Sequence, residues 1–130
     1  MVCLMMMAHL FSLIYGVSFI LIGLSHLREP QKFVEIVPSY LPYALFLVYL
    51  TGIMEIAGGI GIIYPETRKI TGRLLVIFLI AVFPANIYMW THDIAFNGTK
   101  LTTAQHILRA FIQIFLIFMA LFLSGDLSES

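Results

Sequence analysis

Charge is scarce in this 130-residue sequence, because Lys, Arg, Asp and Glu together make up only 11% of it. Soluble domains usually carry about 25% of these residues. The formal net charge is zero, and neither sign forms a block of the kind that binds nucleic acid. A single cysteine, Cys3, excludes an internal disulfide and a CxxC motif. This argues against thiol oxidoreductases, which work with paired cysteines.

Apolar residues make up 61% of the sequence and gather into four runs, each long enough to cross a bilayer. We expect helices at about residues 8–27, 43–63, 72–91 and 102–123. The first run has no basic segment before it and is longer than the core of a signal peptide, which favours a retained helix. The sequence therefore predicts an all-α fold, an antiparallel bundle of four transmembrane helices, as a single integral membrane domain over residues 1–130.

The longest connection, residues 28–42, lies between the first two predicted helices and contains three prolines. Within it, Phe33–Val37 is apolar but too short to span a membrane. This pattern predicts an interfacial or re-entrant segment between helices one and two. It fits an amphipathic loop on the lipid surface as well as a lid over a site.

The second helix places one carboxylate, Glu55, near the middle of an apolar run. A charged side chain at that depth costs about 2.5–3.5 kcal/mol on insertion scales, so intramembrane acids usually have a partner and a function. Glycines on the same helix face let a neighbouring helix approach closely. We therefore expect the other helices to supply a polar niche for Glu55.

The third and fourth helices carry the polar residues that could form this niche. Pro84 leaves the carbonyl of Ile80 without its usual donor, and Asn86 follows two residues later. The fourth helix has a polar stripe at steps of three or four residues, which includes Arg109 and Gln113. The spacing of Thr102 and Gln105 predicts a capping box at the start of this helix.

The antiparallel topology brings these polar positions toward one side of the membrane. At 1.5 Å per residue, Glu55 should lie roughly 20 Å along its helix from that side, and Arg109 roughly 10 Å along its own. Two long side chains can bridge this offset. We expect a pocket whose ligand- or proton-handling residues are His26, Glu55, Asn86, Arg109 and Gln113. In it, Glu55 pairs with Arg109 directly, or through Gln113, Asn86 or water.

Each candidate also has a purely structural interpretation. Glu55 can be protonated and bond to a backbone group, and Arg109 can neutralise Glu55 or extend to the headgroups. Asn86 can satisfy the carbonyl freed by Pro84, and Gln113 can join two helices. The sequence predicts no metal site. A haem between His26 and His106 is a further alternative, although two lone histidines do not identify one.

Four spans place both termini on one side of the membrane. The basic residues on that side, near the turn between helices two and three, are Arg68, Lys69 and Arg73, and those opposite are Arg28, Lys32 and Lys100. The first trio is the more compact, which favours termini in the cytoplasm. We expect a bacterial cytoplasmic membrane. The segment 97–99 also fits a glycosylation sequon, relevant only in a eukaryotic lumen.

Five short motifs follow one another along the sequence: Gly23-Leu24-Ser25-His26, Phe33 with Ile36-Val37-Pro38 and Leu41-Pro42, Thr51-Gly52 with Glu55-Ile56 and Gly59, Val82-Phe83-Pro84-Ala85-Asn86, and Arg109 with Gln113. In this order they resemble the DoxX-like family of small four-helix membrane proteins. The resemblance implies a four-helix membrane bundle. It also implies a place beside other subunits in quinone- or thiol-linked redox complexes, or a role as an assembly factor.

These observations give three functional hypotheses. In the first, the chain is a membrane subunit of a redox complex, and its polar pocket binds a quinone or passes a proton. In the second, it is a non-enzymatic scaffold or assembly factor that docks partner helices. In the third, it is a proton-coupled transporter of small molecules that uses Glu55. Its partners would be the lipid bilayer, other membrane subunits and a second copy of itself as a homo-oligomer.

Overall fold

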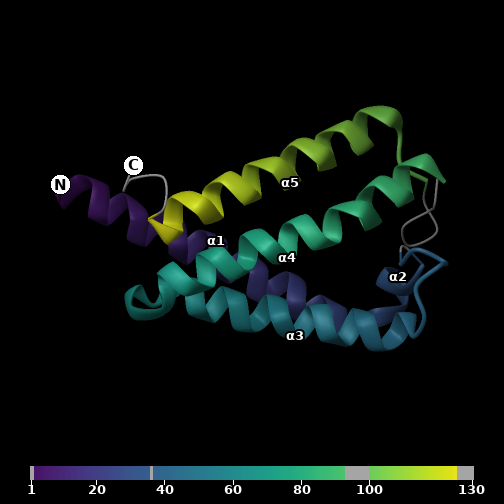
Figure 1. Ribbon diagram of the computed structural model, residues 1–130, viewed down its shortest axis with the longest axis horizontal. Helices are drawn as coiled ribbons and strands as arrows, with labels where there is room; N and C mark the ends of the chain where they lie inside the picture. Colours follow the sequence, from purple (N-terminus) through teal and green to yellow (C-terminus); the bar gives the residue numbers. More distant parts are fainter. Residues whose placement is uncertain (1, 36, 93–99, 126–130) are drawn as a thin grey trace.

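The computed structural model describes residues 2–35, 37–92 and 100–125, and Figure 1 shows their arrangement. This part of the chain consists of helices and connections, with no strand. The helices are α1 (Val2–Arg28), α2 (Pro30–Val34), α3 (Ala44–Ile63), α4 (Pro65–Thr91) and α5 (Thr103–Ser124). All except α2 are long and apolar enough to cross a membrane. The predicted all-α, four-span architecture of an integral membrane protein is therefore confirmed.

Two helices begin earlier than the sequence predicts. α1 starts at Val2 rather than near residue 8, because residues 4–7 are leucine and methionine, which are apolar and favour helix. α4 starts at Pro65 rather than near residue 72. Proline is tolerated in the first turn of a helix, where its missing N–H needs no partner, and Glu66 there complements the helix dipole. The possible sequon at 97–99 lies outside the described residues.

Reciprocal glycines hold α1 against α3. A Cβ on Gly16 would lie 2.5 Å from the carbonyl oxygen of Gly59, and a Cβ on Gly59 would lie 2.4 Å from the carbonyl oxygen of Gly16. One heptad along both helices, a Cβ on Gly23 would lie 2.5 Å from the carbonyl oxygen of Gly52. Only residues without a side chain allow such backbone contact, as at close crossings in membranes. α1 and α3 therefore form one tightly packed antiparallel pair.

α4 and α5 form the second pair. A Cβ on Gly72 would lie 2.8 Å from the carbonyl oxygen of Ala120, which shows how closely the two helices approach near the termini. Further along, Gln113 Nε2 donates to the carbonyl oxygen of Leu79 at 2.9 Å. The predicted capping box at Thr102 starts α5 and is confirmed.

The two pairs meet at one end and diverge toward the other, so the bundle resembles a V in Figure 1. Near the closed end, Arg68 on α4 donates to the carbonyls of Ile62 and Ile63 at the end of α3, both at 2.8 Å. Tyr15 Oη donates to the carbonyl of Leu116 at 3.1 Å and joins α1 to α5. α2 lies at the open end.

Candidate functional site

A cavity of about 440 Å³ lies between the two helix pairs, toward the open end of the V. Its volume falls within the range of about 300–1,000 Å³ typical of small-molecule sites. Most of its wall is apolar, and all five candidate residues line it: His26, Glu55, Asn86, Arg109 and Gln113. The structure therefore brings the candidates together around one space, although not in the pairing that the sequence favoured.

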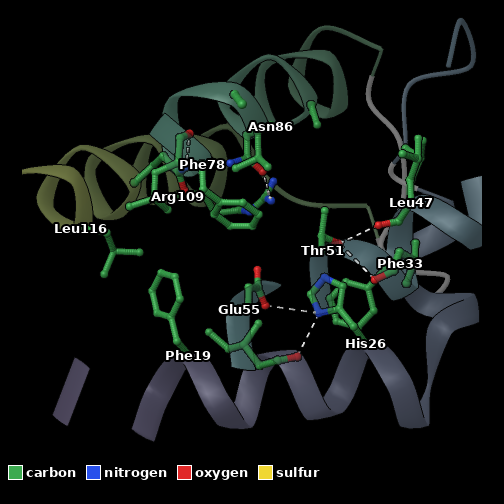
Figure 2. Close-up of a pocket in the computed structure, with 18 of the residues that line it drawn as sticks. Phe19, His26, Phe33, Leu47, Thr51, Glu55, Phe78, Asn86, Arg109 and Leu116 are labelled. Atoms are coloured by element: carbon green, nitrogen blue, oxygen red, sulfur yellow. Dashed lines mark hydrogen bonds and ion pairs between the residues drawn. The ribbon is translucent and has the colours of Figure 1, made fainter. Parts of the chain in front are cut away.

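His26 and Glu55 form the wall on the α1–α3 side (Figure 2). Gly52 makes their approach possible, because a Cβ there would lie 2.7 Å from His26 Cβ. His26 Nδ1 lies 2.9 Å from the carbonyl oxygen of Ile22 and 3.6 Å from Glu55 Oε2. Among the described residues, Glu55 Oε2 is buried and has no hydrogen-bond partner. A buried oxygen without a hydrogen bond costs about 1–3 kcal/mol. Protonation of Glu55, or a hydrogen bond to a ligand, would remove this cost.

Arg109 and Asn86 form the opposite wall (Figure 2). Arg109 Nη2 donates to Asn86 Oδ1 at 2.7 Å, and Nη1 lies 2.9 Å from Met89 Sδ. Both partners are neutral, and no carboxylate in the described ranges pairs with this guanidinium. An arginine has five N–H donors. Arg109 therefore keeps its positive charge and some of its donors available to the cavity.

The predicted direct ion pair between Glu55 and Arg109 is not formed. Glu55 lies closest to His26 on its own helix pair, and Arg109 is bonded to Asn86 on its own. The physical reason is the V shape, since the two pairs separate where these residues lie and leave a cavity between them. Asn86 Oδ1 consequently accepts from Arg109 on α5, and among the described residues no hydrogen bond joins the Asn86 side chain to the carbonyl of Ile80.

Gln113 and Thr51 line the cavity, but their side chains donate hydrogen bonds to backbone carbonyls. Gln113 is buried, and its Nε2 bonds to Leu79 across the α4–α5 contact. This is the helix-joining role that the sequence allowed. Thr51 Oγ1 donates within α3, to the carbonyls of Leu47 and Val48.

α2 and the described residues between it and α3 cover the open end of the cavity, and we call them the cap. Phe33 of α2 stacks on the His26 ring, with centroids 3.8 Å apart and planes at 16°. Ser39 Oγ lies 2.7 Å from Tyr88 Oη and ties the cap to α4. At the surface, a hydrogen bond from Lys32 holds the pKa of Glu29 below its usual value. The apolar segment 33–37 predicted a lid or a loop, but no periodicity links it to His26.

His106 lies outside this cavity. Its ring is buried, stacks on Trp90 with centroids 5.7 Å apart, and has no hydrogen-bond partner within the described part of the chain. His26, in contrast, lines the cavity with Glu55. Among the described residues, no group of three or more His, Cys, Asp or Glu side chains could hold a metal ion.

Comparison with known families corrects the resemblance suggested by the short motifs. The family model that matches residues 15–124 is described as a domain of unknown function (DUF8561), and nothing identifies a DoxX-like protein. The motifs misled because they meet general demands of membrane bundles: Gly23, Gly52 and Gly59 serve close helix packing. Searches of curated proteins and of solved structures found no match.

Proposed function

This chain belongs to the family described as a domain of unknown function (DUF8561), and from that premise we propose that it binds a quinone-type lipophilic molecule in its intramembrane cavity. The proposal rests on one observation. Hydrogen-bonding groups stand on opposite walls of an otherwise apolar cavity, with Glu55 and His26 on one side and Arg109 on the other.

A 1,4-quinone matches this distribution of groups. It is a flat apolar ring with one carbonyl oxygen at each end, so it needs a donor on each of two opposite walls. Arg109 has donors that its neutral partners do not use. On the facing wall, a protonated Glu55 would donate to the second carbonyl, which would satisfy the buried Oε2.

The same groups suit the chemistry of quinone reduction, which consumes two electrons and two protons. Arg109 would stabilise the negative charge that develops on the nearby oxygen. Glu55 would transfer its proton to the other oxygen, which leaves a hydroquinone monoanion beside Arg109 that takes its second proton from water after release. His26 Nδ1, 3.6 Å away, would return a proton to Glu55 as the Nε2 atom of the same ring accepts one from water. The electrons would come from a partner protein, which makes this chain a membrane subunit of a redox complex.

A proton-coupled transporter is the second candidate, and one observation favours it. The Glu55 carboxyl lies in a cavity between two helix pairs that are joined most closely at one end. Movement of one pair against the other could expose such an acid alternately to the two sides. Proton-driven flux in proteoliposomes that disappears in Glu55→Gln would favour this candidate over quinone binding.

Binding can be measured directly, because the sequence contains a single tryptophan, Trp90. It lies next to Met89, which contacts Arg109. We expect 2,3-dimethoxy-5-methyl-1,4-benzoquinones to quench Trp90 fluorescence saturably in nanodiscs. Arg109→Gln should weaken binding about tenfold or more, since a hydrogen bond from a charged group contributes roughly 1.5–3 kcal/mol. The matched control is Arg73→Gln, at an exposed position of α4.

Glu55→Gln separates donation of a hydrogen bond from donation of a proton. In the parent protein, binding should weaken at high pH as Glu55 loses the proton with which it donates. Glutamine donates at every pH, so the variant should bind without this pH dependence, whereas Glu66→Gln on the surface should retain it. Absence of saturable quenching in the parent protein would exclude quinone binding, and partner recovery in mild detergent would then favour the scaffold.

A further inference from the structure

We propose that the ligand of this cavity carries a hydrocarbon tail, and that the tail passes sideways into the bilayer between α1 and α5, beside Ile22 and Ile112. This inference rests on the proposed function for the head group, and it adds the class of molecule and its route. The ligand is a membrane-dissolved amphiphile, not a solute that arrives from water.

The first observation is the separation of α1 and α5. They are joined near the closed end, where Tyr15 Oη donates to the Leu116 carbonyl, and they diverge from there toward the cap (Figure 1). Ile22 follows Tyr15 by seven residues, which is about 10 Å along α1, and Ile112 precedes Leu116 by four, about 6 Å along α5. Both isoleucines therefore lie on the open side of the contact, on the two helices that diverge.

The second observation is the exposure of these two side chains. Both line the cavity, yet Ile22 is 44% exposed and Ile112 is 47% exposed. Deeper lining residues are buried, such as Phe19 at 4% and Leu79 at 3%. A side chain that belongs to the cavity wall and also to the lipid-facing surface marks the rim of an opening. This rim is apolar, so it suits a hydrocarbon chain.

The third observation is the cap, which covers the end of the cavity nearest the water. Phe33, Val37, Pro38 and Leu41 line the cavity there. The cap is held by the stacking of Phe33 on His26 and by the contact between Ser39 and Tyr88. A ligand that reaches the cavity through the bilayer does not have to displace these contacts, whereas a ligand from water does.

The cavity is too small to hold a long hydrocarbon tail, so the tail would have to leave it. About 440 Å³ is near the lower end of ligand-site volumes, enough for a substituted ring and the first part of a chain. Two further lining residues are exposed, Ala81 on α4 and Leu41 in the cap. The α1–α5 side fits better, because both of its helices carry an exposed lining residue, whereas the lining residues of α3 are half-buried or buried: Leu47, Val48, Thr51 and Glu55.

The test compares 2,3-dimethoxy-5-methyl-1,4-benzoquinone without a tail with its 6-decyl derivative, in nanodiscs, by quenching of Trp90. In the parent chain, the decyl compound should bind at least tenfold more tightly. The double variant Ile22→Phe/Ile112→Phe narrows the proposed opening and adds no tryptophan. It should weaken decyl binding about tenfold and leave binding of the tail-free ring within about twofold, which also shows that the variant is folded.

The matched control is Leu24→Phe/Leu108→Phe, on the same two helices at exposed positions that do not line the cavity. It should leave both affinities unchanged. Unchanged decyl binding in the rim variant overturns the route, and so does equal loss of both compounds. Selective loss in Ala81→Phe instead would move the exit to the α3–α4 side and overturn it as well. A parent chain that binds neither compound refutes the proposed function itself.

Discussion

Two arginines illustrate, at the scale of single residues, how this fold accommodates a cation in an apolar bundle. Arg68 is buried and donates to the carbonyls of Ile62 and Ile63, the last residues of α3. The final carbonyls of a helix have no partner within it, so the guanidinium satisfies them as a cap would. Within the part of the chain that the structure describes, the partners of Arg109 are the side chains of Asn86 and Met89 on α4, and Arg109 lines the cavity. The first arginine is committed to the fold, and the second is available to a ligand.

This difference predicts separate effects on stability and binding. Arg68→Met should lower the free energy of unfolding by roughly 1.5–3 kcal/mol, because buried carbonyls of α3 lose charged donors. Thermal unfolding in detergent measures this, with Arg28→Met, at an exposed position at the end of α1, as the control. Quinone affinity in the folded fraction should stay unchanged. Equal stability of the two variants would contradict the capping role.

The pairing of the candidate residues could not have been deduced from their positions alone. Helical spacing indicated that Glu55 and Arg109 belong to inward faces, and both do line the same cavity. Which partner each one takes depends on differences of a few ångströms between helices. Asn86 competes successfully for Arg109 at 2.7 Å because α4 and α5 are adjacent, whereas the pair that carries Glu55 diverges from them.

At the scale of helices, glycine determines which pairs are rigid. Gly16 and Gly23 on α1 face Gly59 and Gly52 on α3, so backbone meets backbone at two points a heptad apart. Contacts this close are stabilised by dispersion over a large area, which is the main attraction between helices in lipid. The α1–α3 pair should therefore move as one unit, and any opening should occur between the pairs.

A small substitution at this contact should be costly. In Gly59→Ala, the added Cβ would meet the carbonyl oxygen of Gly16, and backbone cannot move aside as a side chain can. We expect a loss of about 1–3 kcal/mol in the free energy of unfolding, the usual cost of overpacking. Chemical denaturation in mixed micelles measures it. Ala57→Val, at an exposed position of α3, should change stability little. Equal effects of the two would show that the glycine contact is not tight.

At the scale of the whole molecule, the cap is the element that separates the cavity from water. It is held to the bundle at both ends, to α1 through Phe33 on His26 and to α4 through Ser39 and Tyr88. The Ser39–Tyr88 contact is a single hydrogen bond at the surface, so it contributes on the order of 1 kcal/mol, beside the edge-to-face contact of Tyr40 with Tyr88. The cap should therefore open more often when this bond is removed.

Labelling of a cavity thiol can report this opening. In a Cys3→Ser background, Thr51→Cys places a thiol on the cavity wall. Tyr88→Phe should raise its rate of reaction with a charged, water-soluble methanethiosulfonate several-fold, because the cap loses its hydrogen bond to α4 and keeps the ring contact of Tyr40. Tyr49→Phe, on the lipid-facing side of α3, should leave the rate unchanged. An unchanged rate in Tyr88→Phe would show that the Ser39–Tyr88 bond does not control access.

The sequence by itself determined that this protein spans a membrane four times, because apolar runs of this length can satisfy their backbone groups in lipid only as helices. It also determined which side chains face inward, since charged and amide groups are expelled from the acyl chains. Only the tertiary structure decided that the helices form two pairs, that a cavity separates Glu55 from Arg109, and that Phe33 covers it. Those features depend on the angle between packed surfaces, which a periodic pattern along one helix does not encode.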